Sequence, residues 1–70
     1  MDDLEDNLRA YEDQLPTLLK ENEGRFAVVG RKPNQKDYEF NCWDTFADAN
    51  QYGHQEYGLN PFLIKQVLNN

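Results

Sequence analysis

The sequence predicts one small α+β domain, and three observations lead to this fold class. Apolar residues near the N-terminus recur at a helical spacing, three short runs are typical of strands, and a second helical segment is bounded by capping residues. A chain of 70 residues fits a single domain, so residues 1–70 are expected to fold as one unit. The expected order of elements is α-β-β-α-β.

The first helix is predicted from apolar residues spaced four, three, four and three positions apart: Leu4, Leu8, Tyr11, Leu15 and Leu18. Pro16 interrupts this helix, because proline removes a backbone hydrogen bond and clashes with the carbonyl four residues earlier. We expect either a kink over residues 12–16 or two abutting helices with Pro16 in the first turn of the second. Gly24 ends the segment, since glycine readily adopts positive φ.

Two strands are expected to follow as a hairpin. Residues 25–30 read RFAVVG, an apolar run that is typical of a central strand covered on both faces. Residues 37–43 alternate, with Tyr38, Phe40 and Cys42 on one side. Turn-forming residues at positions 32–35 predict a long loop between the two strands.

The second helix has clear boundaries. Thr45 is followed three residues later by Asp48, a variant of the capping box, and Gly58 is placed to end the helix. Ala49 and Gly53 would let the helix lie close to a sheet. Residues 62–68 (FLIKQVL) are predicted to form the third strand.

The arrangement of the sheet follows from these elements. A right-handed crossover through the second helix makes the second and third strands parallel to each other. The apolar first strand then fits best in the centre, which predicts strand order 2-1-3 with both helices packed on one face. The alternative places the third strand beside the second.

The charge is concentrated near the N-terminus. The net charge is −6, and residues 1–23 carry eight acidic and two basic residues, whereas residues 24–70 carry five of each. Such a helix repels nucleic-acid phosphates and anionic membranes and favours basic partners. The alternative interpretation is a solvated face that keeps a small protein soluble.

Residues that carry chemistry are scarce. The chain has one cysteine and one histidine, so a disulfide within the chain is impossible and a metal site would need several carboxylates. We expect Cys42 to be a small core residue and His54 an exposed helix residue. No phosphate-binding glycine motif is present. The sequence therefore predicts no catalytic residue, no metal and no cofactor.

The compartment is inferred from the same residues. The N-terminus is acidic where a signal peptide would be basic, and no apolar run approaches the ~18 residues that span a bilayer. A lone cysteine fits a reducing compartment. We expect a cytoplasmic protein that does not bind membranes.

Nucleic-acid binding is a weaker alternative. Basic and aromatic residues interleave around the predicted hairpin, where they could stack single-stranded bases: Arg25, Arg31, Lys32, Lys36, Tyr38, Phe40 and Trp43. The favoured interpretation is that the aromatic residues face the core and the basic residues rim a loop, and the net negative charge argues against phosphate binding.

Three stretches of the chain resemble a group of short, stand-alone bacterial domains of unknown function. They are LPTLLKENEGRFAVVG (residues 15–30), DTFADANQYG (residues 44–53) and GLNPFLIKQV (residues 58–67). The resemblance implies an α/β sandwich-like domain and brings no activity or catalytic residues. The chain departs from that group between Gly30 and Asp44, where the loop is longer and basic, which makes residues 31–36 a candidate for specialised use.

The leading hypothesis is a small, non-catalytic protein-interaction module, monomeric or homodimeric, that regulates or inhibits a protein partner. The partner would bind the acidic helix or the open side of the sheet, where Trp43 is a typical interface anchor. An acidic DNA mimic of phage or mobile-element origin is the sharper alternative. The candidate binding residues are Asp2, Asp3, Glu5, Asp6, Glu12, Asp13, Arg31, Lys32 and Trp43.

Overall fold

The order of elements along the chain is the one that the sequence predicts. The computed structural model describes residues 3–69, with side chains from residue 5 onward. The elements are α1 (Asp3–Asn22), β1 (Phe26–Gly30), β2 (Glu39–Trp43), α2 (Phe46–Tyr57) and β3 (Phe62–Gln66). Both β2 and β3 are shorter than expected, because their outer residues continue as loop.

The three strands form one sheet in the order β2-β1-β3. Both outer strands run antiparallel to β1, and Val28 lies opposite Asn41 on one side and Ile64 on the other. The outer strands are therefore parallel to each other and are joined by the crossover through α2. This order confirms the central position of the apolar strand and excludes the alternative in which β3 lies beside β2.

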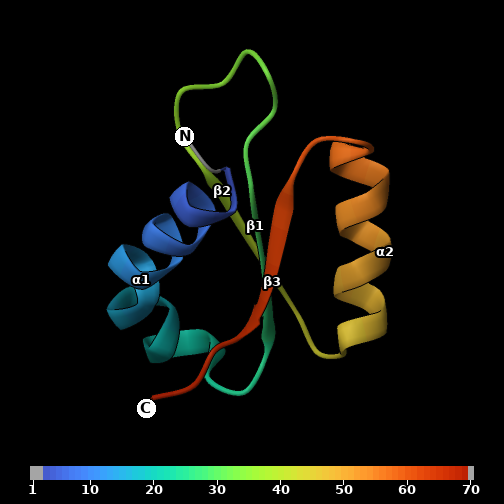
Figure 1. Cartoon of the computed structure of the whole chain (residues 1–70). Helices are drawn as coiled ribbons and strands as arrows, with labels where there is room; N and C mark the ends of the chain where they lie inside the picture. The colour runs from blue at the N-terminus through green and yellow to red at the C-terminus, as the bar shows by residue number, and fades with distance from the viewer. Residues whose placement is uncertain (1–2, 70) are drawn as a thin grey trace.

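The two helices cover opposite faces of the sheet (Figure 1). Ala27 and Val29 pack with Tyr11 and Leu18 of α1, whereas Val28 packs in a second cluster with residues of α2. The expectation that both helices lie on one face is therefore wrong. Successive side chains of a strand alternate between faces, and β1 is apolar on both, so a one-sided arrangement would leave one face of the central strand in water.

Helix α1 continues through Pro16 as a single helix. Figure 1 shows its axis changing direction in the second half, so the kinked alternative is observed rather than two separate helices. Its buried side runs through Asn7, Tyr11 and Leu18, while Leu8 is 38% exposed. The predicted apolar stripe is therefore displaced at Leu8, and the side chain of Leu4 lies outside the described residues.

Caps and one close contact define the remaining boundaries. The Asp48 backbone N–H donates to Thr45 Oγ1 at 3.1 Å, and Gly58 adopts a φ of 59°, as the sequence predicts. Gly53 lies so close to β3 that an added Cβ would come within 2.3 Å of the Phe62 ring. This contact explains why a small residue is needed where α2 crosses the sheet.

Gly24 both ends α1 and distorts the start of the sheet. Its N–H donates to the Val67 carbonyl, while the Val67 N–H donates to the Arg25 carbonyl. Gly24 and Arg25 thus both lie opposite Val67, an arrangement called a β-bulge. The positive φ of 87° at Gly24 is typical of a glycine in such a bulge. Pairing therefore continues one residue beyond the end of β3.

Among residues 3–69, neither helix is both long enough and apolar enough to cross a bilayer.

Candidate functional site

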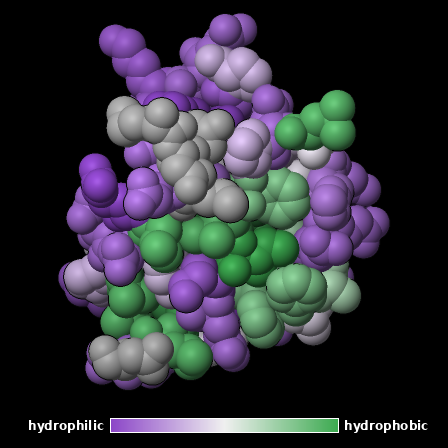
Figure 2. Space-filling view, in the orientation of Figure 1, coloured by the Kyte–Doolittle hydropathy of each residue, from purple (hydrophilic) through white to green (hydrophobic). Residues whose placement is uncertain are grey.

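A groove runs between α1 and β3. Its volume is about 360 Å³, and it is lined by Leu8, Tyr11, Glu12, Leu15, Lys65, Gln66 and Leu68. Leu8 and Leu68 are 38% and 40% exposed, which is high for leucine side chains. Figure 2 shows apolar surface across the middle of this face with hydrophilic residues around it. The groove therefore presents exposed leucine side chains beside polar and charged ones.

One wall of the groove is the open edge of the sheet, because within residues 3–69 no strand pairs with the outer side of β3. The hydrogen bond between Val67 and Arg25 sets the phase of the antiparallel ladder. The register then directs the backbone groups of Leu63 and Lys65 toward β1, and those of Ile64 and Gln66 outward.

A hydrogen bond from α1 agrees with this assignment. The Tyr11 hydroxyl donates to the Gln66 carbonyl at 3.1 Å, which satisfies one outward group of the edge. Burial raises the pKa of Tyr11, so its hydroxyl stays protonated and remains a donor. The next outward groups are the N–H and C=O of Ile64.

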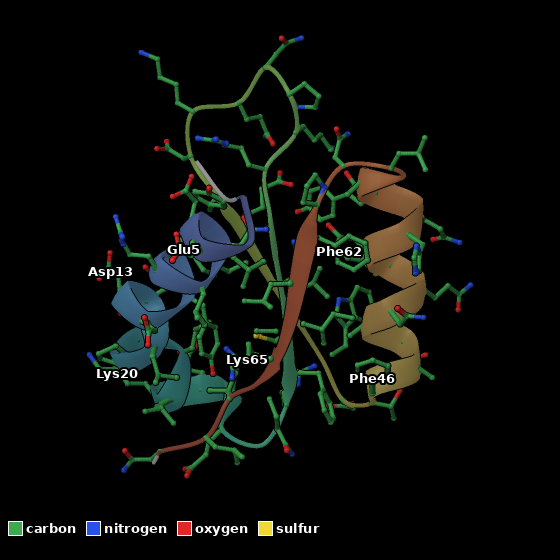
Figure 3. All side chains as sticks on the ribbon, in the orientation of Figure 1. Glu5, Asp13, Lys20, Phe46, Phe62 and Lys65 are labelled. Atoms are coloured by element: carbon green, nitrogen blue, oxygen red, sulfur yellow. The ribbon has the colours of Figure 1, made fainter. Side chains whose placement is uncertain are left out.

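Negative charge lies along the helical wall of the groove. Glu12 lines the groove, and Glu5 precedes it by seven residues, which is close to two helical turns and returns to the same side of α1. Both carboxylates are exposed. Lys65 lies on the opposite wall, on the part of β3 that faces α1 (Figure 3). Within residues 5–69 the ion pairs join other residues, Arg25 to Asp44 and Lys32 to Glu56.

The structure separates the predicted acidic residues. Asp2 and the side chain of Asp3 lie outside the described residues. Asp6 and Asp13, one residue after Glu5 and Glu12, are rotated by about 100° around the helix. Figure 3 shows Asp13 on the outer side of α1. Of the predicted acidic residues, Glu12 therefore lines the groove, and Glu5 lies two turns before it on the same side of α1.

Trp43 does not lie on an open face of the sheet, because each face is covered by a helix. It is half-buried in the cluster that includes α2, and its ring centroid lies 5.1 Å from that of Tyr52. The interface on an open side of the sheet is therefore a wrong expectation, and Trp43 is a packing residue.

The basic residues of the hairpin divide between the two ends of β1. Arg25 pairs with Asp44 at 2.9 Å at one end, whereas Arg31 and Lys32 follow the other. Tyr38 and Phe40 pack against the core cluster beneath α1. The expected group of basic and aromatic residues is thus divided: Arg25 lies apart, whereas Arg31, Lys32 and Tyr38 stay together at one end of β1.

Cys42 and His54 lie on opposite sides of the sheet. Cys42 packs beneath α1, and burial raises the pKa of its thiol. His54 is exposed on α2, with its ring edge-on to Phe62 at 5.2 Å. In the described part of the chain, no three His, Cys, Asp or Glu residues are grouped to hold a metal ion.

A second, smaller hollow lies at the opposite end of β1 from Arg25. Its volume is about 190 Å³, and it is lined by Asn7, Arg31, Lys32, Pro33, Tyr38, Asn60 and Pro61. Sequence reasoning found Arg31 and Lys32 through the basic loop but had no signal for Asn7 or Asn60. From the sequence, Leu8 is expected in the core, and Lys65 and Leu68 have no expected role. A predicted edge strand beside an acidic helix is the signal that indicates where Lys65 and Leu68 lie.

Comparison with protein-family models, with curated proteins and with solved structures finds no match to this chain.

Proposed function

We propose that this protein is a non-catalytic interaction module that binds an extended segment of a partner protein, rich in basic and apolar residues, along the edge of β3. The observation that carries the proposal is the combination of a strand edge unpaired within the described residues, a groove beside it with exposed leucines, and the Glu12 carboxylate in that groove. Peptides often bind by adding a strand to such an edge.

The backbone and side chains of the partner would be recognised separately. The outward N–H and C=O of Ile64 would pair with the backbone of the added strand. Alternate side chains of that strand would point toward α1, where Leu8, Leu15 and Leu68 line the groove. This arrangement selects for an apolar residue at every second position.

Charge would select the other side chains of the added strand. Glu5 and Glu12 favour lysine or arginine on the added strand, within a chain whose net charge is −6. A second copy fits less well, because an antiparallel pairing of two β3 edges would bring two acidic α1 helices onto the same face of the joined sheet. A DNA mimic would use the acidic residues alone, whereas here Glu12 shares a groove with exposed leucines.

The first test uses a short labelled peptide of alternating valine and lysine, with binding measured by fluorescence anisotropy. Leu8→Gln should weaken binding about three- to tenfold, since it removes apolar contact area from the groove. Leu59→Gln is the matched control: Leu59 is fully exposed and lies outside the groove. Equal weakening by both variants, or no binding of the peptide at all, would contradict the proposal.

Backbone pairing has its own readout. Amide hydrogen exchange at Ile64 should slow when the peptide binds, whereas exchange at Lys65, whose N–H is directed toward β1, should change little. A peptide with proline in place of alternate valines should bind poorly, because proline cannot donate to a ladder. Unchanged exchange at Ile64 in the complex would exclude strand addition.

Charge selection is tested by Glu12→Gln against Asp13→Asn, two variants with the same change in net charge. Only Glu12→Gln should weaken the peptide and reduce the salt dependence of its binding. If both act equally, the overall field rather than the groove is responsible. Sedimentation of the protein alone provides the last check, since a dimer that excludes the peptide would assign the edge to a second copy.

A further inference from the structure

The hollow between α1 and the loop from β1 to β2 goes beyond the proposed function and does not depend on it. Its volume of about 190 Å³ corresponds to about six water molecules. This is smaller than the ~300 Å³ or more of sites for drug-sized ligands. The hollow therefore has room for a small ligand or for one chemical group of a larger one.

The charge of the hollow is opposite to that of the chain. Its seven lining residues include Arg31 and Lys32 and no carboxylate, in a protein with a net charge of −6. Lys32 forms an ion pair with Glu56, so its charge is partly compensated. Arg31 has no carboxylate partner within residues 5–69: its guanidinium lies 4.8 Å from the centre of the Tyr38 ring and reaches the Lys36 carbonyl at 3.4 Å.

Asn7 supplies a second, independent observation. It is only 3% exposed, and its Nδ2 has no hydrogen-bond partner among the described residues. A buried donor without a partner costs about 1–3 kcal/mol. Asn7 lies on the buried side of α1, where leucine would avoid this cost, and it also lines the hollow.

We propose that this hollow binds a small oxyanion, a carboxylate or a phosphate group, through Arg31 and Asn7. A guanidinium fork matches the oxygens of either group, and the Asn7 amide would donate to the same anion. Tyr38, Pro33 and Pro61 supply the apolar walls. The anion could be a free metabolite or a terminal group of a peptide, since both present the same oxygens.

Binding is tested by nuclear magnetic resonance on the ¹⁵N-labelled full chain. Inorganic phosphate and acetate are titrated separately, with sodium chloride adjusted to keep the ionic strength constant. Saturable shifts should appear at the Asn7 side-chain amide and at the Arg31 Nε–H. Saturation by phosphate alone assigns a phosphate site, and saturation by acetate alone assigns a carboxylate site. A peptide ending in a free carboxylate, compared with its amide, then tells a terminal group from a free anion.

Two variants separate a built site from general attraction. Arg31→Gln should weaken binding at least tenfold, whereas Arg25→Gln, which makes the same charge change at the other end of β1, should leave it unchanged. Asn7→Leu should weaken binding and at the same time raise the urea midpoint of unfolding, because it removes the unpaired amide. Linear shifts without saturation, or equal effects of Arg31→Gln and Arg25→Gln, would overturn the proposal.

Discussion

Tyr57 contributes to the fold through both its ring and its hydroxyl group. Its ring lies over Gly30, where an added Cβ would come within 2.8 Å of a ring carbon, and its hydroxyl donates to Glu39 Oε1 at 2.9 Å. Burial, then the hydrogen bond to Glu39, raises the pKa of Tyr57 well above its usual 10.0. Hydrogen bonds from Gln35 and Tyr57 lower the pKa of Glu39. The hydrogen bond between Tyr57 and Glu39 links the end of α2 to the start of β2.

This pair predicts a pH dependence at the alkaline end. Because the folded-state pKa of Tyr57 is raised, its contribution to stability is fully present below pH 10 and is lost as the pH rises above 10. Tyr57→Phe lacks this contribution, so its deficit in unfolding free energy relative to the wild type should shrink between pH 9 and 11. Urea unfolding across that range measures it, with Tyr38→Phe as the control for loss of a hydroxyl. A constant deficit would contradict the assignment.

At the scale of elements, α2 approaches β3 closely at Gly53, a small residue from which the sequence already predicts a close approach to the sheet. Gly53 faces Phe62, whose ring also stacks on Tyr57 and meets His54 edge-on. Three residues of α2 thus contact this one ring. The small residues that the sequence placed on this side of α2 serve this approach.

Gly53→Ala should destabilise the protein even though it replaces glycine within a helix. Alanine normally gains about 1 kcal/mol there, but the new Cβ would overlap the Phe62 ring, and overpacking costs about 1–3 kcal/mol. We expect a net loss of about 1 kcal/mol in urea unfolding. Gln51→Ala, at an exposed position of the same helix, is the control and should be neutral or stabilising. A higher midpoint for Gly53→Ala would show that Phe62 can move aside.

At the scale of the whole molecule, β1 belongs to both core clusters. Ala27 and Val29 pack beneath α1, and Val28 packs beneath α2, all fully buried. Neither cluster contains enough apolar residues to fold alone in a chain of this length. The two layers should therefore unfold together as one cooperative unit.

Leu18→Ala tests this coupling. It removes a buried side chain from the α1 cluster and should cost about 2–4 kcal/mol. Trp43 belongs to the other cluster, so its fluorescence reports on the α2 layer. The midpoints from circular dichroism and from Trp43 fluorescence should shift together. Separate midpoints would show that the layers unfold independently.

Much of the candidate site can be predicted from the sequence. Strand order 2-1-3 already leaves β3 at an edge, and the excess of acidic residues up to residue 23 already identifies α1 as the charged wall. The prediction failed at Leu8 and Trp43. Helical spacing does not say which neighbouring residue of a stripe faces the core, and Trp43 was assigned to a sheet face that α2 covers.

Local sequence pattern was enough to predict the elements and the ends of the two helices, because apolar spacing, the Thr45 cap and the glycines at positions 24 and 58 act within a few residues of each other. It also determined that β1 is central, since only a central strand is apolar on both faces. Which face each helix covers, and which distant residues meet, follows only from the packing of the elements in three dimensions. Leu8 and Leu68 share a groove, and Asn7 and Asn60 share a hollow, because packing of separate elements, not local pattern, sets contacts across the chain.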